Sequence, residues 1–189
     1  MNKYWLVALI AIALFASCGG AETESAEAKV PQTQLPAPKN EVVGQDVALL
    51  WNNYLKVRDA LVAAKSTEAG KWALALHLAV GSFPADSLDD EAKLRWARQQ
   101  KDLQQDALTI NTSDIEGQRA AFESLSKTMY QLITELGLPK GYYVYQQHCP
   151  MAFDNRGAWW LSEIPDIVNP YFGDKMLTCG VVKEAFEYN

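Results

Sequence analysis

The chain of 189 residues carries 17 Lys and Arg against 23 Asp and Glu, a formal net charge of −6 at pH 7. It has no basic cluster able to follow a phosphate backbone, so the composition argues against a nucleic-acid partner. It also has no glycine-rich phosphate loop, no G-x-S-x-G elbow and no H-E-x-x-H motif, so we do not expect an enzyme.

The N-terminus has the pattern of an exported lipoprotein. Lys3 provides a positive charge, and an apolar run from Trp5 to Phe15 follows. This run is too short to span a membrane and gives way to polar sequence, which predicts a signal peptide over residues 1–17. Leu14 to Cys18 resembles a lipobox and predicts a diacylglycerol/acyl lipid on Cys18, which would anchor the protein to a membrane. Ordinary secretion with cleavage nearby is the alternative.

Residues 18–43 are expected to form the lipidated cysteine and a flexible linker. The segment is rich in Ala, Glu and Pro and has few apolar residues that could order it. Residues 44–189 are enough for one domain with a single hydrophobic core.

Most of this domain has helical periodicity. Apolar residues recur at intervals of three and four, which predicts helices over 46–64, 67–80, 88–109 and 113–136. The last of these starts at an S-x-x-E capping box, Ser113 to Glu116. A short extended segment is expected over 141–147 and a short final helix over 180–186. The expected fold is all-α: an up-down bundle of about four helices followed by an irregular, loop-rich C-terminal lobe.

The C-terminal lobe contains a candidate metal site. Cys149 and Cys179 each have a methionine nearby, Met151 and Met176, and His148 precedes Cys149. In an extended segment Cys149 and Met151 would share a face, and in a helical turn Met176 and Cys179 would do so. Thiolate and thioether sulfurs select Cu(I) over hard ions. The pattern therefore predicts a Cu(I) or Ag(I) site with these four sulfur ligands and His148 as an optional fifth.

A disulfide between Cys149 and Cys179 is the alternative. Paired cysteines in an oxidising compartment usually form one, and once Cys18 is lipidated an even pair remains, which suits both hypotheses. The methionines would then fill the core, and the protein would be a structural or interaction lipoprotein without a metal. A thiol enzyme is disfavoured because neighbouring residues of a strand, such as His148 and Cys149, point apart.

The same stretch also resembles a known family. Its matching positions are Cys149-Pro150-Met151, Gly157, Trp160-Leu161-Ser162, Ile167, Asn169 to Gly173, Met176 and Cys179-Gly180. This ordered CPM…MxxC pattern is similar to that of a domain-of-unknown-function family of bacterial periplasmic proteins and lipoproteins. The similarity extends weakly back to about Tyr54, and the domain also occurs fused to the C-terminus of Cus-type copper/silver efflux adaptors. The resemblance implies a lipid-anchored protein on the periplasmic side of a bacterial membrane. It would bind Cu(I) or Ag(I), either to sequester the ion or to pass it to an adaptor or pump of a heavy-metal efflux system.

Overall fold

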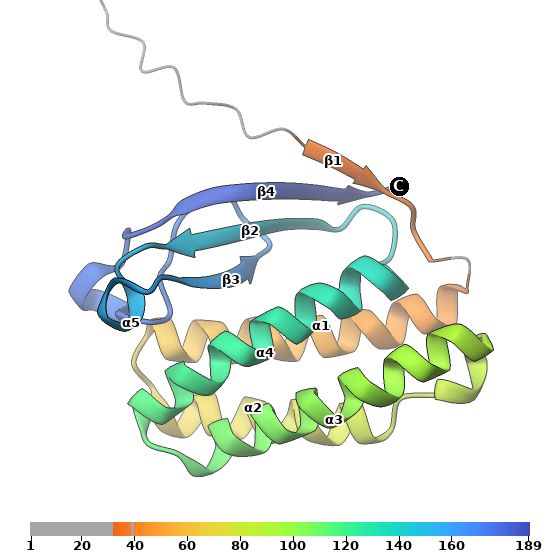
Figure 1. Ribbon diagram of the computed structural model, residues 1–189, viewed down its shortest axis with the longest axis horizontal. Coiled ribbons are helices and arrows are strands. Elements are labelled where there is room, and N and C mark those ends of the chain that lie inside the picture. The colour runs from red at the N-terminus through yellow and green to blue at the C-terminus, as the bar shows by residue number, and fades with distance from the viewer. Residues whose placement is uncertain (1–31, 39) are drawn as a thin grey trace, which may run out of the picture.

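A computed structural model describes residues 32–38 and 40–189 and combines four long helices with one small sheet (Figure 1). The expected signal peptide, Cys18 and most of the expected linker lie outside these residues. In chain order the elements are β1 (Gln32–Leu35), α1 (Glu41–Val62), α2 (Ser66–Gly81), η1 (Ala85–Ser87), α3 (Asp90–Thr112), α4 (Ile115–Leu136), β2 (Tyr143–Cys149), α5 (Ala152–Asn155), β3 (Ala158–Ser162), η2 (Gly173–Met176) and β4 (Val181–Tyr188).

The four long helices form the bundle that the periodicity predicts, with ends that differ by a few residues. Helix α1 begins at Glu41 because the side chain of Asn40 accepts hydrogen bonds from the N–H groups of Val42 and Val43, at 3.0 and 3.4 Å. Helix α4 is capped by Asp114, whose carboxylate accepts a hydrogen bond from the backbone of Gly117 at 2.9 Å. The expected capping box at Ser113 is therefore wrong by one residue.

The expectation of an all-α fold is wrong in the C-terminal lobe, which contributes to a four-stranded sheet. The strand order is β1-β4-β2-β3, with β1 parallel to β4 and the other pairs antiparallel. A β-bulge lies between Gln146 and Gln147 in β2. Helices α1 and α4 lie between this sheet and the α2–α3 pair, so the molecule has three layers (Figure 1).

Two segments were assigned incorrectly because strand pairing is non-local. Residues 181–188 form β4 and not a short helix, since Val181 to Glu187 pair with β2 on one side and Ala185 to Tyr188 pair with β1 on the other. Residues 32–35, expected to be linker, form β1 at the edge of the sheet beside β4. A short polar strand of this kind carries little periodic signal of its own.

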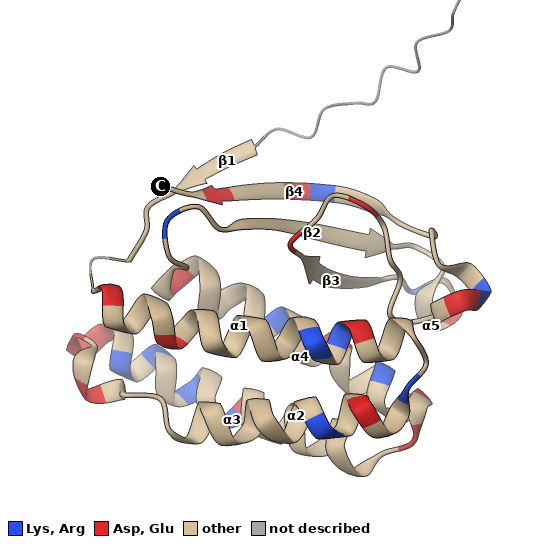
Figure 2. Ribbon diagram, turned by 180° about the vertical axis from the view of Figure 1, so that it is seen from behind, with Lys and Arg blue, Asp and Glu red and all other residues tan. Residues whose placement is uncertain are grey.

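The core is continuous from the bundle into the sheet. Tyr54 stacks between Trp51 and Phe122, with ring centroids 5.6 and 5.0 Å apart. Met129 of α4 and Trp160 of β3 are both fully buried. Acidic and basic residues are interspersed along the described helices (Figure 2). None of the helices in the described part of the chain has the length and apolar character needed to cross a membrane.

Tyrosine hydroxyls cover the outer edge of β3. The hydroxyl of Tyr54 accepts a hydrogen bond from the N–H of Leu161 at 2.9 Å, and the hydroxyl of Tyr171 donates to the carbonyl of Trp159. An exposed edge strand is a site of unwanted pairing. Each hydroxyl satisfies one backbone group of β3 from within the protein, and Tyr54 thereby fixes β3 against α1.

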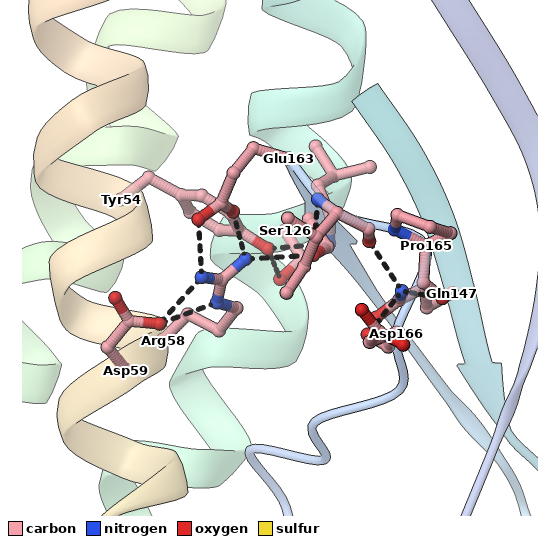
Figure 3. Close-up of polar contacts among 11 residues, drawn as sticks. Tyr54, Arg58, Asp59, Ser126, Gln147, Glu163, Pro165 and Asp166 are labelled. Atoms are coloured by element: carbon pink, nitrogen blue, oxygen red, sulfur yellow. Dashed lines mark hydrogen bonds and ion pairs between the residues drawn. The ribbon is translucent and has the colours of Figure 1, made fainter. Parts of the chain in front are cut away.

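A buried arginine joins α1 to the segment after β3 (Figure 3). Arg58, 2% exposed, donates to Ser162 Oγ at 3.1 Å and to both carboxylate oxygens of Glu163 at 2.5 and 3.2 Å. Its other side pairs with Asp59 at 2.6 Å. In the same region the amide of Gln147 donates to three successive backbone carbonyls, those of residues 164–166. Together these contacts fix the loop that leads to the second cysteine.

Candidate functional site

The site is built around two cysteines brought together from different elements. Cys149 is the last residue of β2, and Cys179 lies between η2 and β4. Both are free thiols, and their Sγ atoms are 2.8 Å apart. Cys149 is fully buried, whereas Cys179 is partly exposed. The structure therefore brings the two predicted sulfurs together.

Sheet pairing and a tight turn position Cys149. It pairs with Ala158 of β3, and the connection between them reverses direction through Phe153, Asp154 and Asn155, with φ of 51°, 56° and 66°. Three successive left-handed residues are costly for side chains with a Cβ. Gly157, with φ of 80°, completes the turn.

An ion pair fastens this turn to α4. Arg156 donates to both oxygens of Glu123, at 3.0 and 2.7 Å, and Glu123 is buried while Arg156 is mostly exposed. Burial alone would raise the pKa of Glu123, but hydrogen bonds from Arg156 and Lys127 outweigh it and hold the pKa below its usual range. The aromatic ring of Phe153 packs edge-on against Tyr171, with centroids 5.3 Å apart.

Asn169 organises the loop that carries Cys179. This fully buried side chain donates to the carbonyl of Cys179 at 2.7 Å and accepts from the N–H of Tyr171 at 2.8 Å. Its backbone also bonds to Leu177 and Gly173, at 2.8 and 3.0 Å. Because one residue ties both ends of the loop together, the position of Cys179 depends directly on Asn169.

The backbones of both predicted methionines, Met151 and Met176, contact Cys179. The N–H of Met151 is hydrogen-bonded to the sulfur of Cys179. The carbonyl of Met176 accepts the N–H of Cys179 at 3.1 Å. The side chain of Met151 is 46% exposed and that of Met176 is half-buried. The backbones of the two segments that carry Cys149 with Met151 and Met176 with Cys179 therefore lie side by side. The thioether of Met151 is open to solvent.

His148 has a different environment. Its ring packs against Trp159 with centroids 4.3 Å apart, and burial together with Lys183 lowers its pKa. Neighbouring residues of a strand point to opposite faces, so the imidazole of His148 and the thiol of Cys149 diverge. The arrangement gives His148 a packing role and does not bring it to the sulfur pair.

The Cys179 thiol is poorly ionised. Burial, together with the neighbouring Cys149, raises the pKa of Cys179 to about 11, and the Met151 hydrogen bond only partly offsets this. Within residues 32–38 and 40–189, no three His, Cys, Asp or Glu side chains are grouped to hold a metal ion. Two thiolates alone suit Cu(I) or Ag(I), whereas structural zinc sites need four ligands.

Sequence reasoning missed the residues that support the cysteines. Asn169 belongs to the N-P pair that carries the family resemblance, but its role depends on side-chain bonds to residues up to ten positions away. Arg156 and Glu123 have no local signal, because they are 33 positions apart and meet only in the folded chain. Gly180 belongs to the motif, but its steric reason is also non-local: a Cβ there would lie 2.9 Å from the ring of Trp160.

Comparison with known proteins gives one match. Residues 50–141 match the family described as "Protein of unknown function (DUF3347)". The matched region contains most of α1 and all of α2, α3 and α4, and it ends before the cysteine pair. The helical part of the chain is thus similar to a domain-of-unknown-function family. No protein of curated function and no solved structure matches the chain.

Proposed function

We propose that this protein is a lipid-anchored soft-metal-binding protein that captures Cu(I) or Ag(I) through Cys149 and Cys179, with Met151 and Met176 as thioether ligands. The observation that carries the proposal is that two free thiols lie 2.8 Å apart, with the backbones of Met151 and Met176 beside Cys179. A donor set of thiolates and thioethers favours soft monovalent ions.

Metal binding requires the two sulfurs to move apart. Thiolates that share one tetrahedral ion, at a metal–sulfur distance of about 2.3 Å, lie about 3.8 Å from each other. The separation of 2.8 Å must therefore grow by about 1 Å. The loop of Cys179 can supply this movement more readily than Cys149, which is held in the β2–β3 ladder.

Cu(I) titration of the reduced protein against a competing chelator tests the proposal. We expect tight one-to-one binding that is lost in Cys149→Ser and Cys179→Ser. In Met151→Leu or Met176→Leu we expect an affinity lower by about tenfold, which corresponds to ~1.4 kcal/mol. Met129→Leu is the matched control, since this methionine is fully buried in the helical core and should leave affinity unchanged. Equal affinity in all five variants would refute the proposal.

A second candidate is a structural or interaction lipoprotein with a Cys149–Cys179 disulfide and no metal. The sulfur separation favours this specifically, because a disulfide needs the atoms to close by only about 0.8 Å. The cross-link would close a loop of about 30 residues and stabilise the fold by about 3–4 kcal/mol in the chain-entropy model. Protein purified without reductant that contains no titratable thiol and binds no Cu(I) after reduction would favour this candidate.

The anchor and the destination of the metal form the rest of the proposal. Cys18 carries the lipid, the domain lies on the periplasmic side of a bacterial membrane, and the ion passes to an adaptor or pump of a heavy-metal efflux system. Support comes from the lipobox-like Leu14 to Cys18 and from the family resemblance. Intact-mass measurement of membrane-extracted protein tests the anchor, and an unmodified Cys18 would refute it.

A further inference from the structure

The two cysteines differ sharply in access to solvent. Cys149 is fully buried and paired to Ala158 in the sheet, whereas Cys179 lies in a loop and is partly exposed. Around Cys179 the side chains of Met151, Leu177 and Val181 are 46%, 39% and 49% exposed. A reagent arriving from solvent therefore meets Cys179 first, and Cys149 lies behind it.

We propose that the Cys149–Cys179 pair is a redox gate on the metal site, operated by thiol–disulfide exchange at Cys179. This inference rests on the proposed function, because the gate controls access of the soft metal to the same two sulfurs. The dithiol form binds the ion. In the disulfide form the two sulfurs are bonded to each other and cannot act as thiolate ligands.

The closing reaction needs an external disulfide, either small or on a protein, as the oxidant. The thiolate of Cys179 attacks one sulfur of that disulfide, forming a mixed disulfide and releasing the other sulfur as a thiolate. Cys149 then loses its proton, attacks Cys179 Sγ and expels the second thiolate toward solvent. Two protons leave the protein and two electrons pass to the external disulfide, which becomes two thiols. A dithiol reductant attacking Cys179 reverses the sequence.

The supporting structure accommodates both states of the pair. Starting from 2.8 Å, the sulfurs close by about 0.8 Å to form the disulfide, or open by about 1 Å around a metal ion. Cys149 is fixed by the strand ladder in either case. The loop of Cys179 moves about the anchor that Asn169 provides through the carbonyl of Cys179, at 2.7 Å.

The test uses full-length protein in detergent, with Cys18→Ser introduced so that only two thiols can titrate. The protein is equilibrated with mixtures of reduced and oxidised dithiothreitol, its thiols are trapped by alkylation and counted by mass, and Cu(I) capacity is measured at each ratio. We expect the two thiols to disappear together and Cu(I) capacity to fall in proportion. With Cu(I) bound beforehand, we expect at least about tenfold more oxidant to be required.

Two single variants test the order of events, with circular dichroism to verify folding. In Cys149→Ser, with oxidised glutathione as the external disulfide in place of dithiothreitol, the partly exposed Cys179 should accumulate as a mixed disulfide with glutathione. In Cys179→Ser, the buried Cys149 should react at least about tenfold more slowly. Equal reactivity of the two thiols would refute the assignment of Cys179 as the exchanging sulfur.

The results of these experiments distinguish a failure of the redox gate from a failure of the proposed metal site. Three results would refute the redox gate but not the metal site. The oxidised protein could still bind Cu(I), the two thiols could fail to form a disulfide with each other, or the disulfide could be reduced only when the protein unfolds. A dithiol form that oxidises reversibly yet binds no Cu(I) would refute the proposed function and, with it, the gate.

Discussion

Replacement of Arg58 by methionine tests whether the buried arginine fastens the C-terminal lobe to the bundle. The side chain is 2% exposed and donates to Ser162, Glu163 and Asp59. Removing one partner of a fully buried ion pair costs about 3–5 kcal/mol. Here Glu163 and Asp59 are 42% and 60% exposed and can be hydrated after the change. The hydroxyl of Ser162 still accepts the N–H of Ile164 at 3.2 Å.

We therefore expect Arg58→Met to lose about 2–3 kcal/mol of unfolding free energy. Urea denaturation followed by circular dichroism measures it, and the expected fall in Tm is about 5–10 °C for a domain of this size. Arg98→Met is the matched control, because Arg98 is exposed and its loss should change stability by less than about 0.5 kcal/mol. If the two variants are equally stable, the fastening role of Arg58 is refuted.

The pH dependence gives an independent check on the same network. Burial alone would raise the pKa of Glu163, but hydrogen bonds from Arg58 outweigh it and hold the pKa below its ordinary value of 4.5. A lowered carboxyl pKa contributes stability above the unfolded pKa and loses it as pH falls through the folded one. The stability gap between wild type and Arg58→Met should therefore narrow below about pH 4.5. A gap that widens there would contradict the assigned pairing.

Three further changes test the support of the site and the start of the bundle. Gly180→Ala places a Cβ 2.9 Å from the Trp160 ring and should cost about 1–3 kcal/mol in urea denaturation. Gly141→Ala, with φ of 88° and nothing within 4 Å, should show only backbone strain of about 1 kcal/mol, and equal losses would refute the steric argument. Tyr171→Phe leaves the carbonyl of Trp159 unpaired and should lower thermal stability by about 1–3 kcal/mol. A neutral effect would mean that water replaces the hydroxyl. Asn40→Ala removes the cap of α1 and should cost about 1 kcal/mol by calorimetry, and no loss would contradict that cap.

The helices were predictable because their signals are local. Apolar residues three and four positions apart lie on one face of a helix, so the four periodic segments correspond to the four long helices, with ends that differ by a few residues. The start of α1 was misplaced by five residues because its cap, Asn40, lies inside a segment whose composition resembles a linker. The sheet was missed because its pairing joins Gln32 to Ala185, and no local pattern reports such a contact.

For the candidate site, too, some properties follow from local sequence and others depend on contacts between distant residues. The sequence by itself determined the chemistry of the candidate ligands: two thiols with two thioethers, spaced so that each pair can share a face. Only the tertiary structure decided that Cys149 and Cys179 meet at 2.8 Å, that His148 packs on Trp159 instead, and that Cys179 is the more accessible sulfur. The physical reason is the sequence separation over which each property is set. Side-chain chemistry belongs to a single residue, whereas the distance between two segments depends on the strand pairing and buried contacts of the whole chain.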